Sequence, residues 1–271
     1  MKFDKALSII LLVLLLLFVA TPLTAGAQQQ GNVSTGNNPL TTAQVVENLV
    51  AMNLRRSQAL HSYQGSRTYR VEYRGFPSTA KAEMVVDVMY RAPGTKEFTI
   101  RSSAGSKLII DKVFNKLLQA EEDALSADAQ RRTALSSENY SFTMARYEST
   151  PARSMYVLIV EPRTKNKFLF RGRVWVDADD FAVVRLEAEP AKSPSFWTKS
   201  SQIEQSYVKV NDFWLPERNH SISSIRLGGR AELTIEYQQY RITASDPVGG
   251  MAAREIARSP HASWAHSPDQ H

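Results

Sequence analysis

Residues 80–91 of this chain read AKAEMVVDVMYR, and they indicate the fold class because apolar side chains recur at every second position. The even-numbered positions are apolar, namely Ala82, Met84, Val86, Val88 and Tyr90. Charged residues stand at the odd-numbered positions 81, 83, 87 and 91. A period of two is typical of a β-strand with one buried and one solvated face. The stretch therefore predicts a strand of an antiparallel sheet.

The same alternation continues in the segments before and after residues 80–91. Their apolar side chains again share one parity within each segment: Tyr69, Val71, Tyr73, Phe98 and Ile100. Three consecutive strands are then expected to present a continuous apolar surface to the same side. Together with Met84, Val86, Val88 and Tyr90, these residues form the candidate ligand-binding face.

Strand patterns recur through the middle of the chain and are separated by short turns. They cover residues 69–74, 80–91, 96–103, 107–110, 140–147, 155–161, 167–170, 172–177, 182–189, 202–210, 214–215, 220–225 and 231–243. Helical periodicity interrupts them at residues 42–60 and 111–125, the second with Glu121 on its polar face. Residues 126–138 are polar and are assigned to neither class.

Closely spaced strands with short turns pair as an antiparallel meander, and a long sheet curls rather than staying flat. The predicted fold class is mainly β with two or more helices (α+β). We expect a curled antiparallel sheet that forms an incomplete barrel covered by helices. The helix at residues 42–60 directly precedes the first strand, and it is expected to lie across the candidate face as a lid or as a permanent plug.

The two ends of the chain differ in composition from this central region. Lys2 and Lys5 precede an apolar run at residues 6–20, and Ala25-Gly26-Ala27 has the A-x-A form of a signal-peptidase site. The run is shorter than the roughly 20 residues of a membrane-spanning helix, so a cleaved signal peptide is favoured over an uncleaved anchor. The predicted organisation is a signal peptide at residues 1–27, a flexible leader at 28–41, a half-barrel domain at 42–243 and a disordered tail at 244–271.

Composition excludes several function classes. The chain contains no cysteine, so disulfides, thiol catalysis and Cys-based zinc sites are excluded. Its formal net charge of +6 either favours anionic lipid head groups or reflects an ordinary mixed surface. The basic residues are scattered without a run, which does not indicate nucleic-acid binding.

The sequence offers little catalytic chemistry. Nucleophile elbows, phosphate loops, zincin helices and calcium loops are absent from it. Asp177, Asp179 and Asp180 cluster between two strands, where aspartate forms turns. We therefore expect no catalytic residue, no metal site and no cofactor. A hydrolase that pairs Asp177 or Asp180 with His61 or His220 is the remaining enzymatic alternative.

Two further stretches carry a resemblance to a known family. Residues 170–177 read FRGRVWVD and residues 207–216 read YVKVNDFWLP. Over residues 42–243 the chain resembles the LolA/LolB-like superfamily, and more specifically the bacterial proteins labelled outer membrane lipoprotein-sorting protein. The resemblance implies an unclosed barrel with a helical lid.

The resemblance also implies a function. The family's best-known members carry lipoproteins through the periplasm by enclosing their acyl chains, and a related branch senses envelope stress by binding lipids or proteins. The sequence therefore predicts a monomeric, non-enzymatic periplasmic protein that binds lipids or lipoprotein acyl chains. A sensor or adaptor domain that docks an envelope protein partner is the alternative.

Export is the most direct of these expectations to test. Mass spectrometry of the periplasmic fraction is expected to find a mature N-terminus near Gln28, because signal peptidase cleaves after the small residues of the A-x-A site. Recovery of the protein only in the membrane, with Met1 intact, would contradict cleavage.

Overall fold

The computed structural model describes residues 40–76, 78–193, 198–226 and 228–244. The predicted signal peptide, most of the predicted leader and the predicted tail beyond residue 244 lie outside these residues. Within the described part of the chain, no helix combines the length and apolar character needed to cross a bilayer.

The first described element is helix α2 (Thr42–Ala59), as the sequence predicts. Thr41 and Gln44 form a capping box, in which each side chain bonds the other residue's backbone N–H and so satisfies two donors that the helix cannot pair internally. Val45, Val46 and Leu49 form its buried face.

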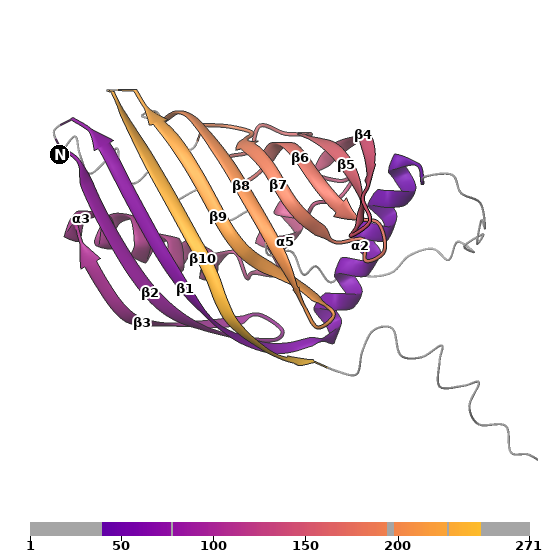
Figure 1. The fold of residues 1–271 in the computed structure, drawn as a ribbon, viewed down its shortest axis with the longest axis horizontal. Helices are drawn as coiled ribbons and strands as arrows, with labels where there is room; N and C mark the ends of the chain where they lie inside the picture. The colour runs from indigo at the N-terminus through magenta and orange to yellow at the C-terminus, as the bar shows by residue number, and fades with distance from the viewer. Residues whose placement is uncertain (1–39, 77, 194–197, 227, 245–271) are drawn as a thin grey trace, which may run out of the picture.

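Ten strands follow and form one antiparallel sheet (Figure 1). They are β1 (Leu60–Gly75), β2 (Ala80–Arg91), β3 (Thr95–Gly105), β4 (Tyr140–Ser149), β5 (Ser154–Pro162), β6 (Phe170–Asp177), β7 (Val183–Pro190), β8 (Thr198–Val210), β9 (Phe213–Ile225) and β10 (Gly229–Ala244). Their order is β3-β2-β1-β10-β9-β8-β7-β6-β5-β4, so the last strand pairs with the first. The sheet is curled but is not closed into a barrel, because the edge strands β3 and β4 do not pair with each other.

Two strand predictions differ from the structure in their bounds. The segments at residues 214–215 and 220–225 belong to the single strand β9. Strand β1 begins at Leu60, directly after α2, and so starts well before the predicted residue 69.

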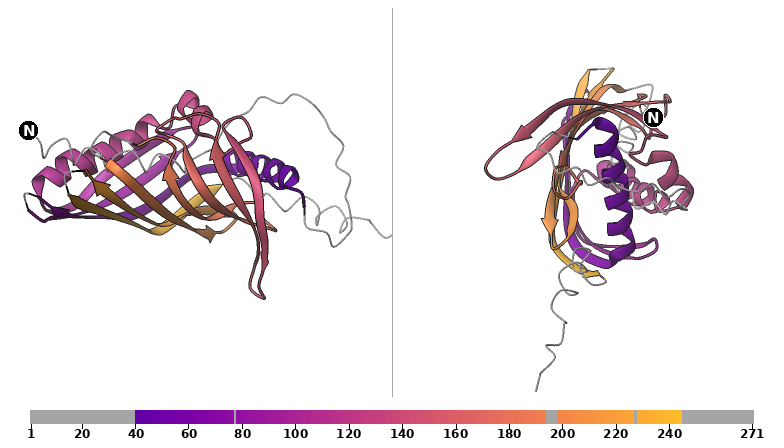
Figure 2. Two further views of the ribbon diagram at one scale, coloured as in Figure 1. Left: turned by 90° about the horizontal axis from the view of Figure 1, so that it is seen from above. Right: turned by 90° about the vertical axis from the view of Figure 1, so that its right-hand side faces the viewer.

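A second helical segment connects β3 to β4. It consists of α3 (Lys107–Ile109), a π-helical turn η3 (Ile110–Phe114), α4 (Asn115–Asp123) and then α5 (Ala127–Thr133). The prediction of a strand at residues 107–110 is wrong, because Ser106 Oγ accepts the Ile109 N–H and caps a helix there. These helices lie on one side of the curled sheet (Figure 2). We call residues 107–123, from α3 to α4, the cover.

The helix-facing side of the sheet carries two separate apolar cores. The first core contains Leu60, Tyr63, Tyr69, Val71, Tyr73, Ala82, Met84, Val86, Val88, Tyr90, Ile109, Val113, Phe114, Leu117, Leu118, Phe213, Leu215, Ile225, Ala231, Leu233, Ile235 and Tyr237. The second core contains Val45, Val46, Leu49, Tyr140, Tyr156, Leu158, Val160, Leu169, Phe170, Val174, Val176, Leu186, Ala191 and Ile203.

The two cores correct the expected position of helix α2. Its apolar residues belong to the second core, with β4 to β7, so the expectation that it covers the first three strands is wrong. The cover occupies that place instead, through Ile109, Val113 and Leu117. The reason is topological: β10 and β9 lie between β1 and the strands that α2 packs against.

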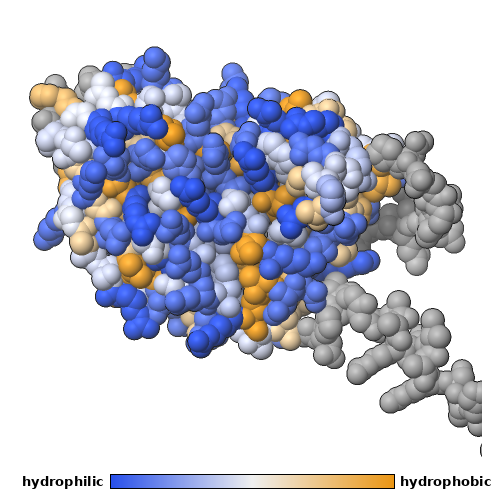
Figure 3. Space-filling model, viewed as in Figure 1, coloured by the Kyte–Doolittle hydropathy of each residue, from blue (hydrophilic) through white to orange (hydrophobic). Residues whose placement is uncertain are grey.

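The opposite face of the sheet is mostly solvated, apart from a small buried apolar cluster of Val157, Trp175 and Val184. Its surface is predominantly hydrophilic, with scattered apolar residues (Figure 3). Arg70 on β1 pairs across the strands with Glu83 and Glu236, at 2.7 Å in both cases. Pairs this exposed contribute little stability. Most of the buried apolar residues lie on the helix-facing side.

The backbones of β6 and β7 approach each other closely at Gly172. Its φ of +151° is one that residues with side chains rarely adopt, and a Cβ there would lie 2.7 Å from Ala188 Cα. We expect Gly172→Ala to lower the free energy of unfolding by about 2 kcal/mol or more, measured by urea denaturation. Gly94→Ala is the control, because its Cβ would stay 3.5 Å from the Leu125 carbonyl oxygen. Equal losses for both variants would contradict this explanation.

Candidate functional site

The candidate ligand-binding face lies largely in the first core. Seven of its nine predicted residues are at most 6% exposed there: Tyr69, Val71, Tyr73, Met84, Val86, Val88 and Tyr90. Phe98 is partly buried against the same core. Ile100 does not join it and is 48% exposed on the edge strand β3. Eight of the nine residues therefore form one surface beneath the cover, and their role in binding stays a prediction.

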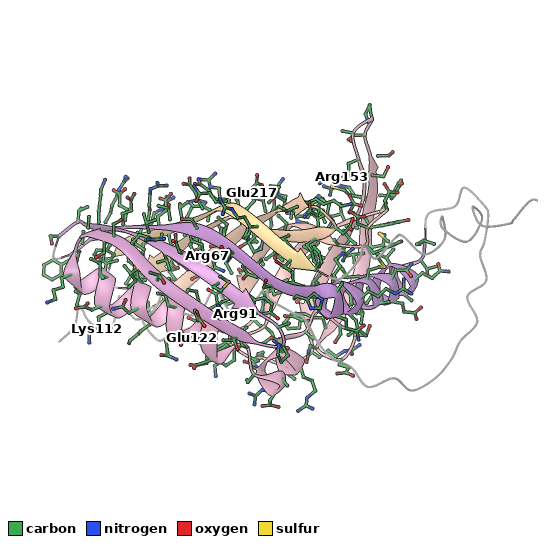
Figure 4. The ribbon with its side chains drawn as sticks, turned by 90° about the horizontal axis from the view of Figure 1, so that it is seen from below. Arg67, Arg91, Lys112, Glu122, Arg153 and Glu217 are labelled. Carbon is green, nitrogen blue, oxygen red and sulfur yellow. The ribbon has the colours of Figure 1, made fainter. Side chains whose placement is uncertain are left out.

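A buried cluster of charges fastens the cover to this surface. Glu121 on α4 lies with its two carboxylate oxygens 2.6 Å from Arg67 Nη1 and 2.6 Å from Lys96 Nζ. The side chains of Arg67 and Lys96 are 4% and 0% exposed. We call these three residues the ion triad. Figure 4 labels Arg67 on the strands and Glu122 beside the helix of the cover.

Aromatic rings surround the ion triad. The Arg67 guanidinium lies 4.9 Å from the ring centroid of Tyr237, and its Nη1 donates to the Tyr69 hydroxyl at 3.3 Å. Lys96 Nζ lies 5.9 Å from the ring centroid of Tyr63, which stacks on Tyr90. Cations over ring faces gain electrostatic stabilisation when they are removed from water. The cations are therefore held by rings as well as by the carboxylate.

Burial and pairing set the pKa values in the cluster. Burial alone would raise the pKa of Glu121, but the charges and hydrogen bonds of Arg67 and Lys96 outweigh it and lower the pKa to about 2. Burial raises the pKa of Tyr69 to about 12, so its hydroxyl stays protonated. Burial also lowers the pKa of Lys96, and Glu121 opposes that shift.

The ion triad was not predicted from the sequence, although a signal for it was present. Arg67 shares the parity of Tyr69, and Lys96 shares the parity of Phe98, so their positions place both on the apolar face once β1 is known to begin at Leu60. The assignment of Glu121 to the polar face of its helix is wrong, because its carboxylate reaches the sheet.

The aspartate cluster has a structural role. Asp177 Oδ1 accepts the backbone N–H groups of Asp179 and Asp180 at 3.0 and 2.8 Å, which closes the turn between β6 and β7. Asp180 Oδ2 accepts hydrogen bonds from Trp214 at 2.8 Å and from Lys209 at 2.6 Å. The carboxylates therefore tie the turn to strands β8 and β9.

His220, one of the two histidines that the hydrolase alternative would use, has another partner. His220 Nε2 lies 2.8 Å from Glu232 Oε1 on the neighbouring strand. Among the described residues there is also no group of three or more His, Asp or Glu side chains that could hold a metal ion. His220 therefore pairs with a glutamate of β10.

Comparisons with known proteins found similar solved structures. No family model matches the chain, and no curated protein matches it. A DUF1329 family protein from Desulfovibrio piger has 11% identity and a TM-score of 0.37, covering 74% of this chain and 92% of that one. The LolA superfamily protein NE2245 from Nitrosomonas europaea has 10% identity and a TM-score of 0.34, covering 76% and 94%.

A third similar structure is an outer membrane lipoprotein-sorting protein domain from Vibrio parahaemolyticus. It has 10% identity and a TM-score of 0.33, and the match covers 79% of this chain and 97% of that domain. The latter two neighbours fall in the group that the sequence resembles. Similarity at this level does not establish function, which is argued below from the residues of this chain.

The ion triad makes stability depend on pH. The pKa of Glu121 is depressed in the folded protein, from 4.5 to about 2, so its contribution is present above pH 4.5 and is lost as the pH falls towards 2. We expect Glu121→Gln to lower the free energy of unfolding by about 3–5 kcal/mol at pH 7, because two buried cations lose their partner. The cost of this substitution is expected to shrink between pH 4.5 and 2.

Glu122→Gln is the matched control, since Glu122 is the next residue and is exposed. Urea denaturation of both variants and the wild type at pH 7 and at pH 3 makes the comparison. Equal stability of the two variants at pH 7 would contradict the role given to Glu121.

Proposed function

We propose that this protein is an exported, non-enzymatic binding protein or carrier for lipids or lipoprotein acyl chains in the bacterial cell envelope. The observation that carries the proposal is the cover: a separate helical segment closes the apolar face of β1 to β3 and is fastened there by one buried ion triad. The eight residues of the candidate face that lie beneath the cover are proposed as the binding surface.

Apolar contacts make exchange between cover and ligand energetically reasonable. Val113, Phe114 and Leu117 of the cover fill the space above Met84 and its neighbours in the first core. An acyl chain would make contacts of the same kind, and each buried methylene contributes about 0.8 kcal/mol. Burial of an acyl chain therefore offsets much of the apolar contact energy that is lost when the cover lifts from the sheet.

Two backbone features, a π-helical turn and a glycine, mark the end of the cover at which we expect it to bend. The turn from Ile110 to Phe114 is π-helical, and such turns occur frequently at functional sites. Gly105, just before the cover, has a φ of +93° that favours glycine. We propose that the cover lifts from this end while the sheet keeps its shape.

The alternative function is a sensor or adaptor that docks an envelope protein partner. In that case the cover is a permanent plug, and the first core is an ordinary core. The two functions differ in whether an acyl chain moves the cover, and this difference sets the experiment.

The absence of cysteine allows spin labels to be placed at chosen positions. We expect hexadecanoic acid to bind the wild type and to shift the distance between labels at Gln119→Cys and Arg218→Cys by several ångströms. Gln119 is exposed on the cover and Arg218 is exposed on the sheet. Double electron–electron resonance measures the distance, and displacement of a fluorescent fatty acid measures binding.

Labels at Lys199→Cys and Arg218→Cys provide the control, because both positions are exposed on the sheet and their distance is expected to stay constant. Binding without movement of the cover would mean that the ligand lies elsewhere. Absence of binding would favour the partner-docking alternative.

A further inference from the structure

A strip of polar side chains lies on the helix-facing side of the sheet, where a core would ordinarily be apolar. It consists of Ser201, Gln205, Asn219, Ser221 and Ser223, which we call the polar strip. All five residues are at most 4% exposed. Polar residues this deeply buried require hydrogen-bond partners.

The strand register places the polar strip between the two cores. Residues directly opposite one another in antiparallel strands point to the same face. One such row crosses the sheet from the first core through the strip to the second core: Tyr69, Ile235, Asn219, Gln205, Leu186 and Val174. The adjacent row joins Leu233 to Ser221 and Ile203. An occupant of this face would therefore meet apolar, polar and again apolar surface.

The hydrogen bonds of the strip leave one acceptor unpaired. Gln205 Nε2 donates to the Ser206 carbonyl oxygen at 3.1 Å, which turns Gln205 Oε1 towards Asn219. Asn219 must then present its Nδ2, and the two atoms lie 2.8 Å apart. Asn219 Oδ1 is buried and has no hydrogen-bond partner. The network thus fixes the orientation of the carboxamide and leaves an acceptor that requires an N–H or O–H group.

We propose that the polar strip binds the uncharged hydrogen-donating group of an amphiphile, a secondary amide or a hydroxyl, while its apolar chains lie on the two cores. This inference rests on the proposed function and adds the class of ligand. An unpaired buried acceptor is costly, so a ligand that supplies the donor gains more than its apolar surface alone would give. Fully apolar chains and tertiary amides lack that donor.

Two probes that differ in one N–H group test the proposal. Their affinities are measured by displacement of a fluorescent fatty acid. We expect N-methylhexadecanamide to bind the wild type about tenfold more tightly than N,N-dimethylhexadecanamide, the ratio expected for one net hydrogen bond. In Asn219→Leu/Gln205→Leu, the two probes are expected to bind equally. Both partners are replaced together because a single replacement would leave another buried polar group unpaired. Circular dichroism and urea denaturation check that the variant folds.

The outcomes separate this inference from the proposed function. Equal binding of the two probes to the wild type would overturn the role of the strip and leave acyl-chain binding intact. The same preference in the wild type and the double variant would also overturn it, because the extra methyl group would then be the cause. If neither amide nor hexadecanoic acid binds, the proposed function itself fails.

Discussion

A curled sheet that is open at β3 and β4 exposes one entire face unless other elements of the chain cover it, and in this protein that face is mostly apolar. Removing apolar surface from water is the main favourable contribution to folding, so the positions of the helices follow from this constraint. Helix α2 covers β4 to β7, and the cover closes β1 to β3. Because two separate helical segments cover this face, the sheet has two cores with a polar strip between them.

The ion triad fixes the position of the cover more than it adds net stability to the fold. Taking three charges out of water costs free energy, and their mutual attraction returns only part of it, so apolar replacements of such clusters are often no less stable. The triad fixes the position of α4 on the sheet, because Glu121 contacts both Arg67 and Lys96 only when α4 lies in one place. Apolar contacts such as those of Leu117 tolerate sliding, whereas paired charges do not. A cover held in this way has a defined closed position and a limited number of interactions to break when it opens.

Much of this architecture could be predicted from the sequence, and the exceptions have physical reasons. Alternation in residues 80–91 identified β2 and the face that it buries, because parity is a local property of a strand. The placement of α2 could not be predicted, because it depends on the strand order, which brings β10 beside β1. The ion triad was missed because the sequence shows a charge but not its partner: Arg67 and Glu121 are 54 residues apart. Asn219 and Gln205 likewise become neighbours only through the register of β8 and β9.

The proposed binding requires the cover to open while the sheet remains folded. Native-state hydrogen exchange at increasing denaturant tests it directly, because the free energy of opening is obtained for each amide. Amides in the cover, residues 107–123, are expected to exchange through an opening of lower free energy than those of β1 and β10. Hexadecanoic acid is expected to change exchange in the cover far more than in the two strands. If the cover and the central strands exchange through the same global unfolding event, with or without the fatty acid, the cover does not open separately from the sheet.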